Sequence, residues 1–276
     1  MKRILPFILM LAFFSCSEQT PEIPCLSCEQ ETGGPDDPQL KKVLIEEFTG
    51  VHRVNCPAGS VEIEGLLDFY GSGLIAVSIH AGFFSDPYPE SQFNFQTDEG
   101  EALNNFLDFP QGYPTAVINR KLFSSEDDLQ LDRSSWGGYV AQELDLETEV
   151  NLTLALSYDS ATRELRATTT INPLVDQSDE VRISVMLTET DIADVQLTPD
   201  GEQADYLHKH VLRDMLTPFD GEMINEAFVA GASIEKTHSI VLKDEWVANK
   251  MDVVVFVHKA GSSREILQAE LSHLPE

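Results

Sequence analysis

The sequence has little positive charge and few cysteines. Among its 276 residues, 18 are Lys or Arg and 47 are Asp or Glu, so the formal net charge is −29 at pH 7. A surface this acidic repels phosphate backbones, which argues against nucleic-acid binding. Four cysteines are too few for a disulfide scaffold in a chain of this length. Hydrophobic residues still make up 42% of the chain, which is enough for a folded core.

No run of residues is both apolar and long enough to cross a bilayer. Residues 4–14 follow Lys2 and Arg3 and are mostly apolar, but eleven residues rise only about 16 Å as a helix. We therefore predict a secretory signal peptide over residues 1–15. Its end, FFSC, resembles the lipobox of bacterial lipoproteins, which implies cleavage before Cys16 and a lipid on the Cys16 thiol. The alternative is an ordinary signal peptide with a chance cysteine at its end.

The segment after the signal peptide lacks the composition of a folded unit. Residues 17–40 contain four prolines and six acids and no Lys or Arg, so we predict that residues 16–40 form a lipidated, disordered acidic tether. Cys25 and Cys28 lie in this tether, and a local disulfide between them is the simplest interpretation. In the alternative, one of them folds back and pairs with Cys56.

Residues 41–147 alternate between strand and helix patterns. We predict strands at 43–48, 74–79, 116–118 and 121–123, and helices from 56 to 70, from 98 to 107 and from about 125 to 144. This is the element order of the thioredoxin fold. Pro57 suits the first turn of a helix, and Pro114 stands just before the third strand, where that fold places a cis-proline. The prediction is an α/β thioredoxin-like domain.

From residue 148 onward the hydrophobic period changes to two. Alternation at 150–158 and 165–171 predicts a hairpin, and further strands are expected at 181–187, 239–242, 253–257 and 266–269. We therefore predict that residues 148–276 form an antiparallel β-sandwich-like domain. Residues 190–235 show no such pattern, and we expect a long irregular insertion there.

Four segments carry a family resemblance. They are KVLIEEFTG (42–50), NCPAG (55–59), GYPTA (112–116) and YLHKHVLR (206–213). Together they resemble the outer membrane protein 28 family, thioredoxin-like lipoproteins of Bacteroidota. The resemblance implies an outer-membrane, lipid-anchored location, on the periplasmic face or the cell surface. It implies no established activity.

One position departs from that family pattern. Family members commonly carry Cys-x-x-Cys-Pro, whereas here Arg53 stands at the first cysteine and only Cys56 remains. Dithiol exchange within one chain needs both sulfurs, so it cannot run at this turn. Arg53 could still favour a thiolate at Cys56 and give a monothiol site. The alternative is that Cys56 is an unreactive relic packed under the helix. Catalytic candidates are thus limited to Cys56, Arg53 and Pro114.

Two histidines are weak metal candidates. His208 and His210 would share one face of a strand, but no third ligand is in view. The sequence contains no cofactor-binding fingerprint, and we predict no cofactor.

Two functions remain. The first is a non-catalytic outer-membrane or cell-surface lipoprotein, held to the membrane by the lipid on Cys16, that binds a protein or peptide partner in envelope assembly or adhesion. The alternative is a thiol-dependent envelope oxidoreductase that uses Cys56, alone or with a tether cysteine.

Overall fold

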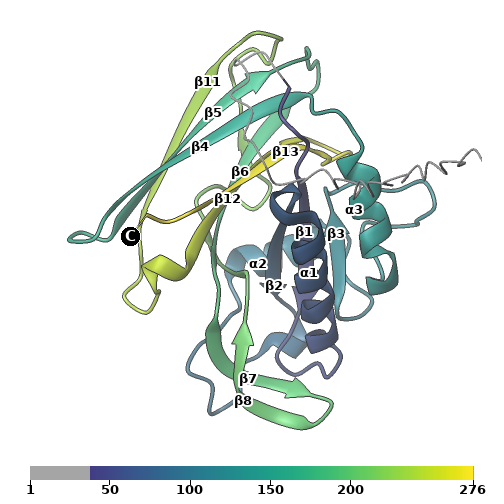
Figure 1. Ribbon diagram of the computed structural model, residues 1–276, viewed down its shortest axis with the longest axis vertical. Helices are drawn as coiled ribbons and strands as arrows, with labels where there is room; N and C mark the ends of the chain where they lie inside the picture. The colour runs from purple at the N-terminus through teal and green to yellow at the C-terminus, as the bar shows by residue number, and fades with distance from the viewer. Residues whose placement is uncertain (1–37, 276) are drawn as a thin grey trace, which may run out of the picture. The chain divides into compact units, whose positions relative to one another are not determined.

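The structure, a computed structural model, describes residues 38–275 (Figure 1). The predicted signal peptide, the lipid on Cys16 and the pair Cys25 and Cys28 lie outside these residues. Within residues 38–275, no helix has the length and apolar character needed to span a membrane.

The elements up to residue 147 alternate as the sequence predicts. In order they are β1 (Val43–Thr49), α1 (Cys56–Tyr70), β2 (Leu74–His80), α2 (Asp98–Phe106), β3 (Thr115–Ile118) and α3 (Trp136–Leu144). The remaining chain contributes strands, which are β4 (Val150–Asp159), β5 (Glu164–Pro173), β6 (Val181–Glu189), β7 (Ile192–Thr198), β8 (Gly201–His208), β9 (Val211–Met215), β10 (Glu222–Met223), β11 (Ile234–Val241), β12 (Met251–Lys259) and β13 (Ile266–His273).

One large sheet contains strands from both regions of the sequence. Its order is β13-β12-β6-β9-β2-β1-β3, with β10 paired to β6. The regions join where β2 pairs with β9, through Ser78 opposite Val211. The other strands form a three-stranded antiparallel sheet, β11-β5-β4, and the hairpin β7-β8. The fold is therefore a mixed α/β core with a large sheet and additional antiparallel sheets, which confirms the predicted fold class at this level. Local hydrophobic periods did not predict the β2–β9 pairing, because it joins segments far apart in the chain.

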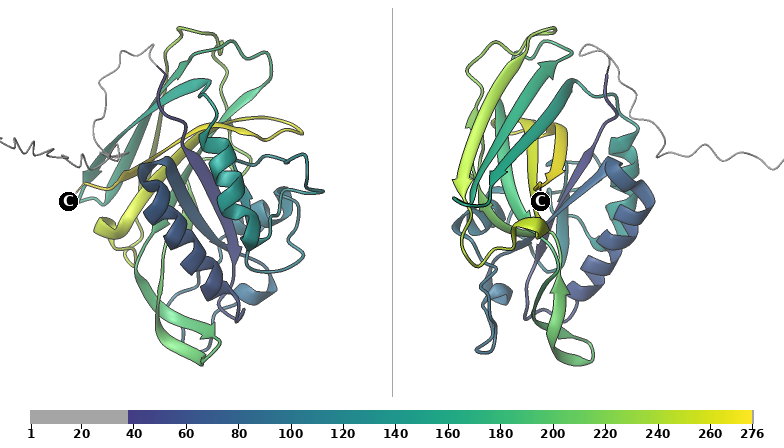
Figure 2. Two further views of the ribbon diagram at one scale, coloured as in Figure 1. Left: turned by 45° about the vertical axis from the view of Figure 1, so that its right-hand side comes forward. Right: turned by 60° about the vertical axis from the view of Figure 1, so that its left-hand side comes forward.

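Strand β1 is buried along its whole length because both of its faces are covered. Helices α1 and α3 contribute Ile63 and Trp136 to a core with Val43 and Ile45 on one face. On the other face, Leu44 and Phe48 share a core with α2 and with Phe256 of β12. A further core lies between the three-stranded sheet and strands β6 and β12. The three-stranded sheet and the helices α1 and α3 form separate layers in both views of Figure 2.

Three local predictions are wrong. The strand expected at 121–123 is absent, because Asn119 and Arg120 adopt positive φ values of 48° and 50° and turn the chain. Instead, Leu131 forms an isolated antiparallel bridge to Ala116 of β3. This extended residue prevents a helix from 125 onward, so α3 begins only at Trp136. Residues 190–235 are not irregular, since they contain β7, β8, β9 and β10.

Candidate functional site

The candidate site lies at the N-terminus of α1, where the sequence places Arg53 and Cys56. Helix α1 begins at Cys56, and its second residue is Pro57, whose missing N–H needs no partner in the first turn. Asn55 precedes the helix without a side-chain capping bond, and the first turn contains no acid. The positive end of the helix dipole is therefore not offset by a capping side chain or by an acid of the first turn.

Cys56 is a free cysteine with 1% of its surface exposed. Burial raises the pKa of its thiol to about 12, against smaller opposing effects of Thr49 and Arg53. At neutral pH the group is thus a protonated thiol that solvent scarcely reaches. Because the thiolate is the nucleophile in thiol chemistry, this environment opposes reactivity.

Arg53 binds the backbone beside the cis-proline. Its Nε donates to the carbonyl oxygen of Tyr113 at 3.1 Å, and its guanidinium lies 5.2 Å from the centroid of the Phe84 ring. The Tyr113–Pro114 peptide is cis, as the sequence predicts. The structure therefore brings Arg53 to the segment that contains Pro114, and the Tyr113 carbonyl already has a hydrogen-bond partner.

Glu47 lies behind this site and was not predicted as a site residue. Its side chain is fully buried, and the Ser78 hydroxyl donates to its Oε2 at 3.1 Å. Its Oε1 has no hydrogen-bond partner among residues 38–275. Burial raises the pKa of Glu47 to about 8, so the carboxyl is mostly protonated at neutral pH. The charge of an ionised Glu47 is one of the effects that raise the Cys56 pKa. The only sequence signal was a Glu pair inside an otherwise apolar strand.

Gly59 allows α1 to approach the cis-proline segment closely. A Cβ at this position would lie 2.8 Å from the Cβ of Pro114, and it would also meet the Glu47 carboxyl. A side chain larger than hydrogen would therefore push the first turn of α1 away from Pro114. Because position 59 is glycine, Pro114 and Glu47 can pack against the first turn of α1, which begins at Cys56.

Exposed apolar side chains flank the same region. Val54, Phe83 and Phe109 are 37%, 82% and 56% exposed, and we call these three residues the apolar rim. Val54 lies in the chain between Arg53 and Cys56, and Phe109 lies on the segment that leads to Tyr113. The Phe83 ring lies 5.5 Å from the ring of Phe84, which in turn contacts Arg53. Val54 and Phe109 therefore adjoin the candidate site along the chain, and Phe83 adjoins it through Phe84.

The two histidines suggested as metal ligands have different neighbours. Strand β8 ends at His208, and His210 has a positive φ of 53°, so the predicted shared face does not form. His208 is buried against Phe95, whereas the Nε2 of His210 lies 3.1 Å from Glu64 of α1. The two histidines, which the sequence suggests only as weak metal candidates, therefore lie in separate environments. Within residues 38–275, no three His, Cys, Asp or Glu side chains form a group suited to a metal ion.

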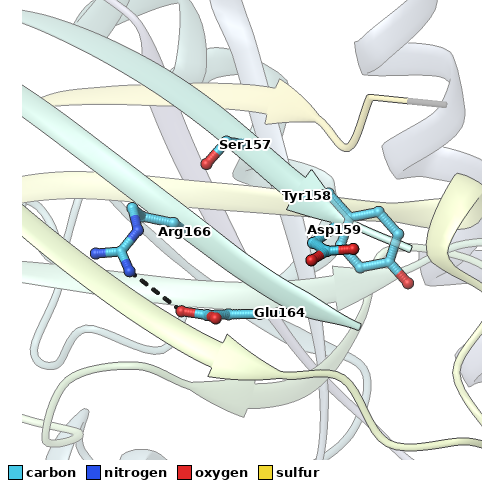
Figure 3. A pocket seen from close by; sticks show the side chains of 5 residues that line it. All are labelled: Ser157, Tyr158, Asp159, Glu164 and Arg166. Atoms are coloured by element: carbon cyan, nitrogen blue, oxygen red, sulfur yellow. Dashed lines mark hydrogen bonds and ion pairs between the residues drawn. The ribbon is translucent and has the colours of Figure 1, made fainter. Parts of the chain in front are cut away.

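A shallow pocket lies elsewhere, at the end of the β4–β5 hairpin (Figure 3). It contains a half-exposed ion pair between Arg166 and Glu164 at 3.1 Å. Ser157, Tyr158 and Asp159 complete its lining. None of the predicted site residues lies in it, and its arginine already pairs with Glu164.

The chain is similar in fold to proteins of known structure. HBP35 of Porphyromonas gingivalis is 20% identical, with 85% of this chain and 75% of that chain covered and a TM-score of 0.69. Protein AGR_C_4864 from Agrobacterium tumefaciens is 12% identical, with 86% and 99% covered and a TM-score of 0.51. At such identities the likeness concerns the fold alone.

Two other comparisons bear on the family. No curated protein matches the chain. The model of the family described as Outer membrane protein Omp28 matches residues 102–273, which is more than half of the chain. The chain therefore belongs to the Omp28 outer membrane protein family.

Proposed function

We propose that this protein is a non-catalytic outer-membrane lipoprotein whose α1 region binds a protein or peptide partner, in envelope assembly or adhesion. The observation that carries the proposal is the state of Cys56, which is buried and has a pKa raised to about 12. Arg53 stands where a nucleophilic cysteine would be needed and is bound to Tyr113. A site of this kind can recognise a partner but lacks the sulfur chemistry of a dithiol enzyme.

We infer that residues 41–147 form a thioredoxin-like domain and residues 148–276 a β-sandwich-like domain. The order β1-α1-β2-α2-β3-α3 and the cis peptide before Pro114 support the first assignment. The shared core between the three-stranded sheet and strands β6 and β12 supports the second. The boundary at residues 147 and 148 remains a prediction, because one sheet continues across it.

Family membership supports an outer-membrane location. The anchor proposed here is a lipid on Cys16, followed by the acidic tether up to residue 40. Which face of the membrane the folded part occupies, the periplasmic face or the cell surface, belongs to the same proposal. Protease accessibility on intact cells distinguishes the two faces, and a Cys16→Ser variant should be released from the membrane fraction.

Enzymatic activity is tested by disulfide exchange. We expect the wild-type protein and Cys56→Ser to reduce the disulfides of insulin, with dithiothreitol as the electron source, no faster than background. Arg53→Cys restores a Cys-x-x-Cys spacing and serves as the matched control that should exceed both. Turnover by the wild-type protein that Cys56→Ser abolishes would favour the alternative, an oxidoreductase that uses Cys56.

Partner binding is tested on the apolar rim. Random dodecapeptides displayed on phage are the probe, and we expect selected peptides to bind the wild-type protein. The double variant Phe83→Ser/Phe109→Ser should lose that binding, because it removes most of the exposed apolar surface of the rim. Phe69→Ser is the matched control, since Phe69 is 80% exposed in the last turns of α1, away from the rim. Equal binding by all three proteins would contradict the assignment of the rim.

A further inference from the structure

The β7–β8 hairpin is attached to the loop that leads into α1. The Leu197 N–H donates to the carbonyl of Val51 at 2.8 Å. The side-chain amide of Gln196 reaches the carbonyls of Gly50 and Arg53 at 3.5 and 3.4 Å. Figure 1 shows the hairpin beside the end of α1 where the helix begins. A segment from the second half of the chain therefore holds the candidate site loop, residues 50–53.

The base of this hairpin rests on a buried pair of histidines. His208 ends β8 and His80 ends β2, and each is 4% exposed. Their ring centroids lie 5.5 Å apart, and both rings contact Phe95. Neither Nδ1 of His80 nor Nε2 of His208 has a hydrogen-bond partner within the described part of the chain. The pair is therefore packed as two aromatic rings, with nitrogen atoms that no neighbour satisfies.

Charged neighbours act in opposite directions on the two rings. Arg213 of β9 lowers the pKa of His80 and is itself paired with Glu189 of β6 at 3.4 Å, with Glu245 as a second acid nearby. Asp194 of β7 raises the pKa of His208, but burial of that ring outweighs it.

The Asp194 carboxylate is already engaged with the backbone. It accepts the N–H groups of Gln92 at 3.0 Å, Phe93 at 2.8 Å and Val195 at 2.8 Å. The phenol of Tyr206 is the remaining titratable group against the His208 ring. The next histidine along the chain, His210, lies 3.1 Å from Glu64 of α1.

Burial determines the pH at which the two histidines would gain a proton. Burial lowers the pKa of His208 to about 4, and burial together with His208 and Arg213 lowers that of His80 well below 6.5. When the hairpin base opens, both rings regain water and an ordinary pKa. The open form then binds protons that the closed form does not bind. The closed form therefore loses stability relative to the open form as the pH falls from about 6.5 to about 4.

We propose that the β7–β8 hairpin is an acid-released latch on the candidate binding site, with His80 and His208 as its trigger. At neutral pH the hairpin holds residues 50–53 through Gln196 and Leu197. In acid the hairpin base separates from β2, and the carbonyls of Gly50, Val51 and Arg53 lose these partners. The inference uses the proposed binding role only for its consequence, a site that changes its partner affinity with pH.

Amide hydrogen exchange tests the latch itself. We compare the full chain at pH 7 and pH 5 after correction for the intrinsic exchange rates. His208 alone, with its pKa of about 4, should reduce the protection of the hairpin about 20-fold between these pH values. Protection of β5 serves as the internal reference, because β5 lies outside the hairpin and contains no histidine. Unchanged hairpin protection, or an equal loss in β5, would overturn the latch.

A variant identifies the trigger. His80→Gln/His208→Gln cannot gain charge at these positions, so its hairpin protection should not change between pH 7 and pH 5. His273→Gln is the control, since the His273 side chain is 82% exposed and belongs to β13, outside the hairpin. The same pH dependence in the double variant and the wild-type protein would overturn the assignment of the two histidines as the trigger. If the double variant does not fold, the comparison of the wild-type protein at pH 7 and pH 5 still shows whether acid releases the hairpin.

Peptide binding separates the latch from the proposed function. Dodecapeptides selected on the apolar rim are measured at pH 7 and pH 5. If hydrogen exchange of the hairpin depends on pH but peptide affinity does not, the regulatory role is overturned and the binding role is unaffected. No peptide binding at either pH, with pH-dependent exchange intact, would instead contradict the binding role and leave the latch as a conformational property.

Discussion

Two adjacent carboxyl groups on β1, Glu46 and Glu47, meet opposite environments. Both side chains are fully buried, and they point to opposite faces of the strand. Glu46 accepts two hydrogen bonds from Arg120, from Nε at 2.9 Å and from Nη2 at 2.7 Å. Among residues 38–275, Glu47 has only the Ser78 hydroxyl as a hydrogen-bond partner, and its pKa rises to about 8. Both carboxyl groups are equally buried, so the two positions differ in their partners: a guanidinium for Glu46 and a single hydroxyl for Glu47.

The two faces serve different purposes in the fold. The Arg120 guanidinium lies 4.7 Å from the centroid of Phe256, so the ion pair ties β1 to β12 and joins the two halves of the chain. Glu47 lies against the first turn of α1 and, while protonated, places no charge beside Cys56. The face with Glu46 thus stabilises the fold through an ion pair. The face with Glu47 places no charge at the candidate site while Glu47 is protonated.

The largest expected effect on stability comes from removing one partner of the buried Glu46–Arg120 ion pair. Arg120→Met would leave Glu46 buried without its counter-charge, and we expect a loss of about 3–5 kcal/mol in the free energy of unfolding. Denaturant unfolding measures it. Arg166→Met, which removes a half-exposed ion pair with Glu164, is the control and should cost under about 1 kcal/mol. Similar costs for the two variants would contradict the special role of the buried pair.

A double variant sharpens this result. Glu46→Met/Arg120→Met removes both charges, so no uncompensated charge remains in the core. We expect it to recover much of the stability that Arg120→Met loses, as replaced buried ion pairs often do. A double variant no more stable than Arg120→Met would show that packing, rather than charge pairing, sets the cost.

The raised pKa of Glu47 should be visible in the pH dependence of the free energy of unfolding. The Glu47 pKa is raised above its unfolded value near 4.5, so its contribution is fully present below pH 4.5 and is lost as the pH rises through about 8. Unfolding curves at pH 5, 6.5 and 8 should show that the stability of the wild-type protein, relative to that of Glu47→Gln, declines by a few kcal/mol as the pH rises. Glu47→Gln cannot ionise at this position but keeps the contributions of the buried histidines, so the difference between the two proteins isolates Glu47. Identical profiles would mean that Glu47 is charged in the folded protein.

The smallest effect concerns the single hydrogen bond of Glu47. Ser78→Ala removes the hydroxyl that lowers the Glu47 pKa, so that pKa should move above about 8. Carbon-13 NMR titration of the Glu47 carboxyl measures the shift. We expect a stability cost of about 1 kcal/mol, typical of one hydrogen bond. A Glu47 pKa that stays the same or falls would show that another group determines it.

Local patterns predicted the elements that depend on neighbours in sequence. Strand β1, helix α1 and the cis peptide at Pro114 follow from apolar runs, a proline at a helix start and a Tyr-Pro before a strand. Helix α2 was also predicted, and its N-cap is Thr97, whose side-chain oxygen accepts from the N–H of Gly100 at 2.9 Å.

Long-range contacts could not be predicted from the same patterns. The partner of Glu46 is 74 residues away, and the histidine that packs on His208 is His80 rather than His210. The β7–β8 hairpin was missed because β8 is exposed on most of its residues and shows no apolar alternation. The protonation of Glu47 depends on the full burial that only the folded sheet provides.

The central claim is that Cys56 is a buried, protonated thiol in a site that binds without sulfur chemistry. Alkylation of the folded full chain by iodoacetamide, followed by mass spectrometry across pH 6–10, tests it most directly. We expect negligible modification of Cys56 throughout this range and rapid modification once the protein is unfolded. Modification of folded Cys56 with a titration midpoint at or below pH 8 would contradict it.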